Sequence, residues 1–365
     1  MKNYLNFETE IKDLEVELEK LKDPYNQSGL SEVDTQKISK TQAELDEKLK
    51  NIYANLNPWE TTTVARHEDR PKSEFFINNL FDDFIPLSGD RYYGEDKAVV
   101  SGFAKFNNQS VLVIGQEKGD TLDTRIERNF GMMRPEGYRK TIRLMKLADK
   151  FKIPIISFID TPGAYPGVGA EERGQAEAIA KSIECCMKLK VPTISIIVGE
   201  GGSGGAIALA SSNKVIMLEN AIYSVISPEG CATILWRDPK KMLDAAKAMK
   251  LSAKELLDLK VIDEIIPEPI GGAHRNKDLI LANVRKCISK NLEIFKENSS
   301  EEILNQRKNK FLNIGREKGF VSNTENLIDL RSKNFNFQKL LSSKKILISI
   351  TIFGIIVFSS AIFFL

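Results

Sequence analysis

Two glycine-rich segments hold the residue types best suited to chemistry in this chain. The first reads DTPGAYPGVG at 160–169, and the second reads GEGGSGGA at 199–206. Each follows an apolar run and precedes a helical pattern, which predicts a strand, a tight turn and a helix start. Glycine allows close approach of another backbone, and N–H groups at a helix start carry partial positive charge. Such turns bind a phosphate or carboxylate, or stabilise a transient oxyanion.

The second segment also matches two short motifs of other chemistry. GEGGSG at 199–204 fits the G-x-G-x-x-G motif of dinucleotide-binding proteins. GGSGG at 201–205 fits the G-x-S-x-G nucleophile elbow, and Asp263 and His274 follow Ser203 in the order of a Ser–Asp–His hydrolase. Because glycine is abundant here, each motif alone is weak. The residues therefore leave a serine hydrolase using Ser203 open as an alternative.

The elements that must position these turns alternate along the chain. Apolar, β-branched runs predict strands, and longer amphipathic stretches between several of them predict helices. The predicted strands are 97–101, 111–115, 154–159, 192–198, 214–218 and 222–226, and the predicted helices are 135–150, 170–189 and 203–212. This alternation is typical of an α/β core, in which strand-to-helix junctions hold the functional site.

The amino-acid composition excludes several classes of protein and argues against one kind of site. Among 365 residues, 52 are Lys or Arg and 50 are Asp or Glu, so the net charge is +2 and no overall field favours nucleic acid. The 42% hydrophobic content excludes a disordered acidic chain and a polytopic membrane protein. Two histidines and four cysteines without C-x-x-C spacing argue against a metal site. The cysteines are expected to be reduced and buried.

The two ends of the chain differ from this core. Residues 1–57 have apolar residues at alternating spacings of three and four, which predicts an N-terminal helical hairpin. Residues 58–320 contain the catalytic core, and 321–345 form a polar linker. Residues 346–365 hold no charge and would span ~30 Å as a helix, the thickness of a hydrocarbon core. They predict a C-terminal transmembrane anchor that tethers a cytoplasmic protein to the membrane.

Longer strings identify a family that this chain resembles. They are ARHEDRP (65–71), GDR (89–91), NFGMMRPEGYRK (129–140), FIDTPGAYPGVGAEERGQAEAIA (158–180), GEGGSGGA (199–206), SVISPEGCATILW (224–236) and IDEIIPEPIGGAHR (262–275). Together they resemble the carboxyltransferase alpha subunit of the multi-subunit acetyl-CoA carboxylase of bacteria and plastids, over about residues 4 to 318. The resemblance implies an α/β fold of the crotonase type (ClpP/crotonase), a spiral of ββα units, here with the N-terminal helical hairpin and a C-terminal hydrophobic helix.

The resemblance also implies the activity and the partners. With a beta subunit in an α2β2 assembly, the chain would transfer a carboxyl group from carboxybiotin to acetyl-CoA, which forms malonyl-CoA for fatty acid biosynthesis. Biotin would be carried by the biotin carboxyl carrier protein, not bound covalently here, and biotin carboxylase would load it. No metal is expected on this chain. A catalytically silent scaffold that binds the carrier protein is a second alternative.

Site residues follow from the resemblance and from the two turns together. The resemblance places the biotin side of the reaction on the alpha subunit, and the catalytic donors are assigned to Gly204 and Gly205, with Gly163 and Ala164 facing them. Weaker candidates for substrate binding are Tyr165, Glu171, Glu172, Arg173, Pro228, Glu229, Gly230 and Arg134. The two acids could equally complement a helix dipole, and Arg134, like Arg139 and Lys140, could be a solvated helix charge.

Overall fold

The computed structural model describes residues 3–23 and 35–316. The predicted linker at 321–345 and the predicted membrane helix at 346–365 lie outside the described residues. Within the described ranges, every helix is too short or too polar to cross a membrane. Residues 1–312 form one compact unit, and residues 313–365 are assigned to another.

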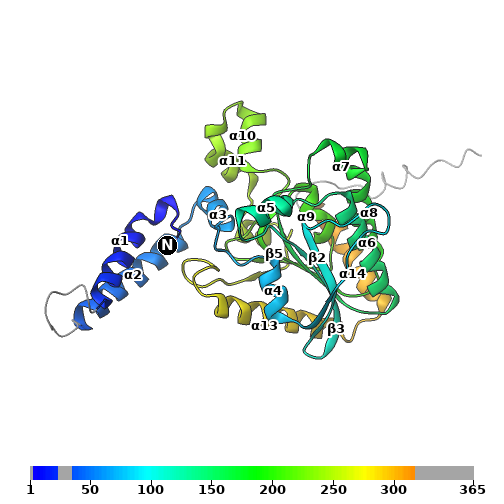
Figure 1. Cartoon of the computed structure of the whole chain (residues 1–365), viewed down its shortest axis with the longest axis horizontal. Helices are drawn as coiled ribbons and strands as arrows, with labels where there is room; N and C mark the ends of the chain where they lie inside the picture. Colours follow the sequence, from blue (N-terminus) through cyan, green and yellow to red (C-terminus); the bar gives the residue numbers. More distant parts are fainter. Residues whose placement is uncertain (1–2, 24–34, 317–365) are drawn as a thin grey trace, which may run out of the picture. The chain divides into compact units, whose positions relative to one another are not determined.

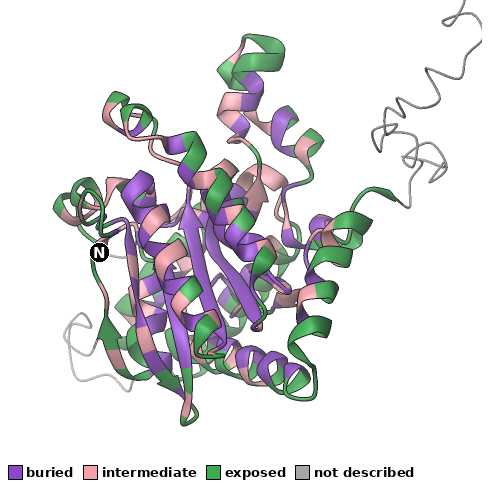
Figure 2. Ribbon diagram, turned by 90° about the vertical axis from the view of Figure 1, so that its right-hand side faces the viewer, coloured by how far each residue is buried: buried purple, intermediate pink, exposed green. Residues whose placement is uncertain are grey.

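One mixed sheet organises the first unit. Its strands are β1 (Asp82–Pro86), β2 (Val99–Phe106), β3 (Gln109–Gln116), β4 (Ile155–Thr161), β5 (Thr193–Gly202), β6 (Lys214–Leu218), β7 (Ile222–Ser224) and β8 (Glu264–Ile266). They lie in the order β1-β2-β3-β4-β5-β6-β8, and β7 pairs with β5. The first three strands pair antiparallel and the remaining pairs are parallel. Every residue of β4 and β5 is buried, as expected for parallel strands covered on both faces (Figure 2).

The helices predicted at 135–150 and 203–212 are present, whereas the helix predicted at 170–189 is interrupted at Gly174, which has φ of 82°. The α-helices are α1 (Thr9–Lys22), α2 (Thr35–Ala54), α3 (Pro58–Ala65), α4 (Ser73–Leu80), α5 (Leu122–Glu127), α6 (Pro135–Lys150), α7 (Val168–Glu172), α8 (Gln175–Lys188), α9 (Ser203–Ala210), α10 (Pro228–Trp236), α11 (Met242–Met249), α12 (Ala253–Asp258), α13 (Lys277–Phe295) and α14 (Ser300–Asn313). Short 3-10 helices lie at Asn6–Glu8, Asn129–Gly131 and Pro239–Lys241. The alternation of strands and helices confirms the α/β class.

Successive residues of β4 show how helices cover the two faces of the sheet. The Phe158 ring stacks on Phe76 of α4, with ring centroids 5.4 Å apart. The neighbouring Ser157 shares a hydrogen bond with Ser195 of β5, whose hydroxyl donates to the Leu209 carbonyl oxygen of α9. Because neighbouring residues of a strand point to opposite faces, α4 and α9 cover opposite faces (Figure 1). The helix that follows the second glycine-rich turn is therefore packed directly on the sheet.

Two pairs of helices extend away from the sheet. Helices α1 and α2 pack through their own apolar cluster of Ile11, Leu18, Leu45 and Leu49, so the predicted N-terminal helices are present. Between β7 and β8 the chain forms the second pair, in which α10 and α11 pack on each other through Cys231, Ala232 and Ala245. Figure 1 shows α10 and α11 standing clear of the sheet, near the end of β5 from which α9 starts. We call residues 225–250 the arm.

Candidate active site

The two glycine-rich turns meet where β4 and β5 end. Thr161 of β4 pairs with Gly201 of β5, and α9 begins two residues later. A Cβ atom placed on Gly205 would lie 2.6 Å from the Gly163 carbonyl carbon and 2.9 Å from the Ala164 nitrogen. Real Cβ contacts are longer than this, so only glycine at 205 lets the first turn pack against α9. The four residues assigned as backbone donors thus lie at one place, with Gly204 next to the contact.

Side-chain hydrogen bonds hold both turns in place. The Thr161 hydroxyl donates to the Gly163 carbonyl oxygen at 2.6 Å and accepts from the Gly163 N–H at 3.2 Å. From β3, Gln116 donates its Nε2 to the Gly205 carbonyl oxygen at 2.8 Å. Gln116, Thr161, Gly163 and Gly205 are all buried. The backbone geometry at the start of α9 is therefore set by the sheet before any ligand binds.

A largely apolar cavity opens beside Gly204. Its volume is about 620 Å³. It is lined by Ser203, Gly204, Ile207, Tyr223, Ser224, Val225, Ile226, Met249, Leu256 and Val261. The first N–H groups of a helix have no acceptor within the helix. Those at the start of α9 border this cavity, so an anionic oxygen on an apolar ring system could enter from this side.

A chain of ion pairs, in which the Asp160 and Glu200 carboxylates are buried, lies beside the two turns. Lys118, two residues beyond β3, places its Nζ 2.8 Å from Asp160 Oδ1 and 3.3 Å from Glu200 Oε2. Arg66 then bonds to Glu200 and, through its other terminal nitrogen, to Glu229 of α10, each at 2.6 Å. Asp160 also accepts the Glu200 N–H at 2.9 Å. The network joins the strand ends of both turns to the arm.

The charges in this network stabilise one another. Burial alone would raise the pKa of Glu200, but Lys118 and Arg66 outweigh it and hold the pKa below its ordinary value. Burial alone would lower the pKa of Lys118, but Asp160 and Glu200 outweigh it and raise the pKa. Both groups are therefore charged at neutral pH, and removal of Lys118 would leave the buried Asp160 carboxylate without its cationic partner.

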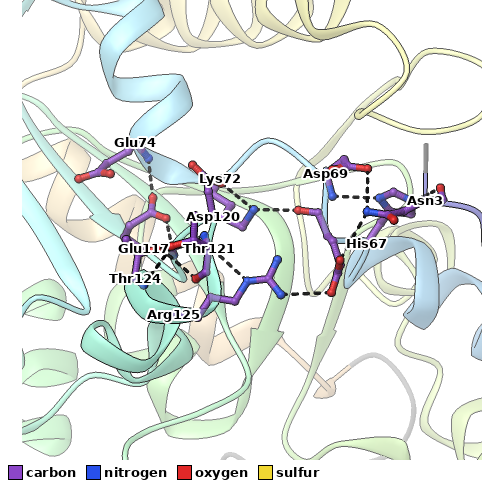
Figure 3. A network of polar contacts seen from close by, with 12 residues as sticks. Asn3, His67, Asp69, Lys72, Glu74, Glu117, Asp120, Thr121, Thr124 and Arg125 are labelled. Carbon is purple, nitrogen blue, oxygen red and sulfur yellow. Dashed lines mark hydrogen bonds and ion pairs between the residues drawn. The ribbon is translucent and has the colours of Figure 1, made fainter. Parts of the chain in front are cut away.

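A second polar network holds the segment between α3 and α4 (Figure 3). Lys72 donates to the Glu68 carbonyl oxygen at 2.9 Å and pairs with Asp120 at 2.8 Å. Arg125 of α5 pairs with the Glu68 carboxylate at 3.3 Å. His67 lies at the other end, where its Nε2 is 3.0 Å from the Asn3 carbonyl oxygen. These contacts hold the segment against α5 with the residues before it and against Asn3 near the N-terminus.

Tyr165 and Arg134 are brought together beside the first turn. The Arg134 guanidinium carbon lies 4.7 Å from the centroid of the Tyr165 ring, and Arg134 also bonds to the Asn129 side chain at 3.1 Å. The Tyr165 N–H donates to the Met133 carbonyl oxygen at 3.1 Å. The two residues form a half-buried wall close to Gly163 and Ala164.

The other weak candidates lie in different surroundings. Glu171 and Glu172 are exposed at the end of α7. Arg173 pairs with Glu136 of α6 at 2.9 Å and stacks on the Tyr93 ring at 4.2 Å. Its guanidinium therefore braces α6 and the loop after β1.

Pro228, Glu229 and Gly230 begin α10, at the root of the arm. The Ser227 hydroxyl caps this helix by accepting the Gly230 N–H at 3.1 Å. Glu229 faces Arg66, as described above. Lys140, considered in the sequence as a solvated helix charge, is instead buried and donates to the Val99 and Asp96 carbonyl oxygens. It is therefore a structural lysine.

The residues of the hydrolase alternative are not assembled as a triad. The Asp263 carboxylate accepts the Val215 N–H at 2.7 Å and pairs with Lys310. The His274 ring stacks on His67 with centroids 3.9 Å apart, and its buried Nδ1 has no hydrogen-bond partner. Because Asp263 does not orient His274, Ser203 lacks the relay that a serine hydrolase requires.

The four cysteines agree with the expectation of buried, reduced thiols. Cys185, Cys186, Cys231 and Cys287 are free and buried. Burial raises the pKa of Cys185 to about 11 and that of Cys186 and Cys287 to about 12. Among the described residues, no group of three or more His, Cys, Asp or Glu is placed to hold a metal ion.

Sequence reasoning missed the charged residues that support the turns. Lys118, Asp160 and Glu200 follow or end the strands β3, β4 and β5, which lie side by side in the sheet. Polar residues at neighbouring strand ends were therefore the available signal. Arg66 carried no such signal, because its partner Glu200 is 134 positions away.

Comparisons with known proteins fit this geometry. The family model "Acetyl co-enzyme A carboxylase carboxyltransferase-like" matches residues 4–315. An acetyl-coenzyme A carboxylase carboxyl transferase subunit alpha from Pelagibacter ubique (strain HTCC1062) is 75% identical over 360 residues, 98% of each chain. The protein of the same name from Chelativorans sp. (strain BNC1) is 53% identical over 316 residues, 87% of this chain and 99% of that one.

Solved structures match in fold at low sequence identity. Transcarboxylase 12S matches with a TM-score of 0.51 and 19% identity, over 62% of this chain and 42% of that chain. The geranyl-CoA carboxylase beta subunit of P. aeruginosa matches with a TM-score of 0.51 and 15% identity, over 68% of this chain and 46% of that chain.

The α/β sheet, with two backbone turns packed together at a helix start, belongs to a carboxyltransferase that shares its fold with transcarboxylase 12S. Within this class, the match over residues 4–315 and the close relatives leave no ambiguity. The chain belongs to the family of acetyl-CoA carboxylase carboxyltransferase alpha subunits. Its activity is biotin-dependent carboxyl transfer. The glycine motifs are therefore not those of a serine hydrolase or of a catalytically silent scaffold.

Proposed function

We propose that this chain supplies the biotin side of the carboxyl transfer and that backbone N–H groups do most of its chemistry. The observation that carries the proposal is the contact of Gly205 with Gly163 and Ala164. It brings the start of a helix and a rigid turn together, so that backbone N–H groups of both are close to each other. No side-chain acid or base is required there, in agreement with the absence of an assembled triad.

The residues at this point suit the ring of biotin. The cavity of about 620 Å³ beside Gly204 is lined mainly by apolar side chains, which fits a compact apolar bicycle with one polar edge. When bound, carboxybiotin supplies the carboxyl group and develops negative charge on its ureido oxygen. The N–H groups of Gly204 and Gly205 would face that oxygen, and those of Gly163 and Ala164 would complete the set. One such donor is typically worth about 3 kcal/mol in the transition state.

The remaining candidates take supporting roles in this proposal. Tyr165, under the Arg134 guanidinium, forms a wall on the side of the first turn. Pro228, Glu229 and Gly230 form the opposite wall at the arm, and Glu229 acts as a positioning residue through Arg66. Arg173, with Glu171 and Glu172 on its helix, would contact a partner protein rather than the reacting atoms. We also propose that the chain forms the spiral of ββα units that is expected for this fold.

The proposed partners follow from the reaction. The acetyl-CoA enolate would be stabilised by a beta subunit in an α2β2 complex, with biotin delivered by the carrier protein and loaded by biotin carboxylase. The test is malonyl-CoA formation from acetyl-CoA, carrier, biotin carboxylase and ATP, with and without the matching beta subunit. Activity is expected only when both subunits are present. A folded α–β complex that forms no malonyl-CoA would contradict the proposal.

We also infer that residues 346–365 tether the enzyme to the cytoplasmic face of a membrane. The support is their sequence, twenty uncharged residues preceded by Lys344 and Lys345. The Pelagibacter relative matches 98% of this chain, whereas the Chelativorans relative matches 87% of it. Membrane fractionation of cells expressing the chain with and without residues 344–365 tests this. If both forms stay in the soluble fraction, the tether is wrong.

A further inference from the structure

A second cavity lies beside the end of β4, apart from the cavity at Gly204. Its volume is about 210 Å³, and Asp160 and Pro162 line it where the first turn begins. No described residue lines both cavities. The second cavity is smaller than the cavities of about 300–1,000 Å³ that hold drug-sized ligands. A small inorganic ion therefore fits it better than a nucleotide does.

Cationic side chains dominate the lining of this second cavity. They come from the segment between α3 and α4, from the segment that follows β3, and from α5. The cations are Arg66, Arg70, Lys72, Lys118 and Arg125, and the carboxylates in the same lining are those of Asp160 and Glu200. Because the cations outnumber the carboxylates, the lining has an excess of positive charge. We call this second cavity the cationic cavity.

Three of the cations are already held by buried carboxylates. Lys118 and Arg66 both pair with Glu200, whose side chain is only 7% exposed. Arg70 pairs with Glu268, whose side chain is fully buried. Breaking a buried ion pair is costly. These three cations therefore contribute positive charge to the cavity but keep their partners in the protein.

Lys72 and Arg125 differ from the other three, because the carboxylates that pair with them face solvent. Lys72 pairs with Asp120 at 2.8 Å, and Arg125 pairs with Glu68 at 3.3 Å. The Asp120 side chain is 86% exposed and that of Glu68 63%, whereas Lys72 is 9% exposed and Arg125 22%. The Lys72 and Arg125 side chains extend in the same direction (Figure 3). Ion pairs with exposed carboxylates contribute little stability, so an anion that enters the cavity can replace them.

A further wall of the cavity has an unusual backbone conformation. Phe130 lines the cavity, is 43% exposed and has φ of 55°. Its neighbours Asn129 and Gly131 have φ of 48° and 80°. Bulky residues rarely adopt this conformation, and such strain is concentrated at ligand-binding and catalytic sites. A Cβ atom at Gly131 would lie 2.6 Å from the Asp160 carbonyl oxygen. The close packing of Gly131 on β4 therefore keeps Phe130 at the cavity.

We propose that the cationic cavity binds a small polyvalent anion of the phosphate and pyrophosphate class, separately from the site of carboxyl transfer. The Arg125 guanidinium would donate two parallel N–H groups to phosphate oxygens, and the Lys72 ammonium would supply a compact positive charge. The anion would replace Asp120 and the Glu68 carboxylate as the partner of these two cations.

The test measures binding of inorganic pyrophosphate to the purified full chain by isothermal titration calorimetry, without divalent cations and at constant ionic strength. One pyrophosphate is expected to bind per chain. Arg125→Gln and Lys72→Gln should each raise the dissociation constant by about tenfold or more, because each removes a charge-assisted contact. Arg128→Gln is the matched control, since Arg128 ends the same helix, is 19% exposed and pairs with Glu74. It should bind within about twofold of the unsubstituted protein.

The possible results are distinct. If Arg125→Gln binds pyrophosphate as tightly as Arg128→Gln does, the cavity is not the binding site and the proposal is overturned. Heats that never saturate, or equal heats with chloride, would mean nonspecific attraction only and would also overturn it. If acetyl-CoA displaces pyrophosphate from the chain assembled with its beta subunit, the cavity holds the phosphates of that substrate, and a separate anion site is wrong. None of these measurements uses turnover, so they are independent of the proposed function.

A second measurement covers the case in which a variant does not fold. Hydrogen exchange of the unsubstituted chain is compared with and without pyrophosphate at the same ionic strength. Amides of residues 66–72 and 119–131 are expected to slow by about threefold or more on binding, whereas those of α13 keep their rates. Unchanged exchange in both segments at high pyrophosphate concentration would overturn the proposal by itself.

Discussion

Gly205 packs so closely on Gly163 that no side chain fits between them. The carbonyl carbon of Gly163 would lie 2.6 Å from a Cβ atom at position 205, and the Gly163 oxygen 2.7 Å from it. This contact joins two turns that are separated by more than thirty residues in the chain. It holds the first turn against the first residues of α9.

The first prediction is that Gly205→Ala abolishes most carboxyl transfer. The added methyl group must push the first turn away from α9 and misplace the N–H donors, so kcat is expected to fall by about 10²- to 10³-fold. Overpacking of this kind also costs about 1–3 kcal/mol of stability. Malonyl-CoA formation and urea denaturation measure the two effects.

Alanine variants of two other glycines serve as controls for that result. At Gly204 a Cβ atom would meet Ile179 at 3.5 Å, an ordinary contact, so Gly204→Ala should cost less than Gly205→Ala. At Gly94 nothing lies within 4 Å of the added atom, and Gly94→Ala should keep both stability and turnover. Equal activities of the Gly204 and Gly205 variants would show that the contact does not matter.

The second prediction concerns the hydroxyl of Ser203. Ser203 is exposed and has φ of 52°, a conformation that favours glycine. Ser203→Gly should fold well and keep carboxyl transfer within about tenfold, because backbone N–H groups carry the chemistry. A nucleophilic serine would instead lose about 10⁴-fold or more. The same malonyl-CoA assay distinguishes the two outcomes.

The third prediction is that Lys118→Met strongly destabilises the fold. The substitution leaves the buried Asp160 carboxylate without its cationic partner, whereas Glu200 keeps its pair with Arg66. Removing one partner of a buried ion pair costs about 3–5 kcal/mol. Lys181→Met removes an exposed helical pair with Glu177 and should leave the urea midpoint where it was. If the two variants unfold alike, the network has no structural importance.

The fourth prediction is a pH dependence of stability that comes from His274. Burial, together with His67 and nearby cations, lowers the pKa of His274 to about 3, from an ordinary value of 6.5. Below pH 6.5 the unfolded chain binds a proton that the folded chain does not. Stability therefore falls as the pH falls, by about 2 kcal/mol between pH 7 and pH 5 from this residue alone.

His274→Phe keeps a flat ring against His67 but cannot take up the proton. Its free energy of unfolding should change less between pH 7 and pH 5 than that of the unsubstituted protein. Urea titrations at the two pH values give the difference directly. Parallel changes in both proteins would mean that His274 titrates normally in the folded state.

The sequence predicted the core where local pattern and tertiary structure agree. The helix expected at 135–150 is α6 with the same bounds, because its amphipathic period is regular and Pro135 starts it. The strand expected at 192–198 is longer in the structure, since β5 runs from Thr193 to Gly202. The extra residues look like a turn in sequence, but β7 pairs with them at Glu200, Gly201 and Gly202.

The parts that were missed depend on contacts that no local pattern contains. β8 is three residues long and is stabilised by its pairing with β6. The links from Arg66 to Glu200 and Glu229 span 134 and 163 positions. The positions of the two glycine turns could be predicted, because glycine and proline mark turns locally. Their packing on each other could not, since it depends on the order of strands in the sheet.

The four buried thiols have a practical consequence for handling this protein. At neutral pH the raised pKa values of Cys185, Cys186 and Cys287 keep almost no thiolate available, and burial shields the sulfur atoms from reagents. Alkylation or oxidation then has to wait until the surrounding structure opens. The rate at which a thiol reagent labels the chain would thus act as an internal clock for unfolding, with no added dye or fused reporter.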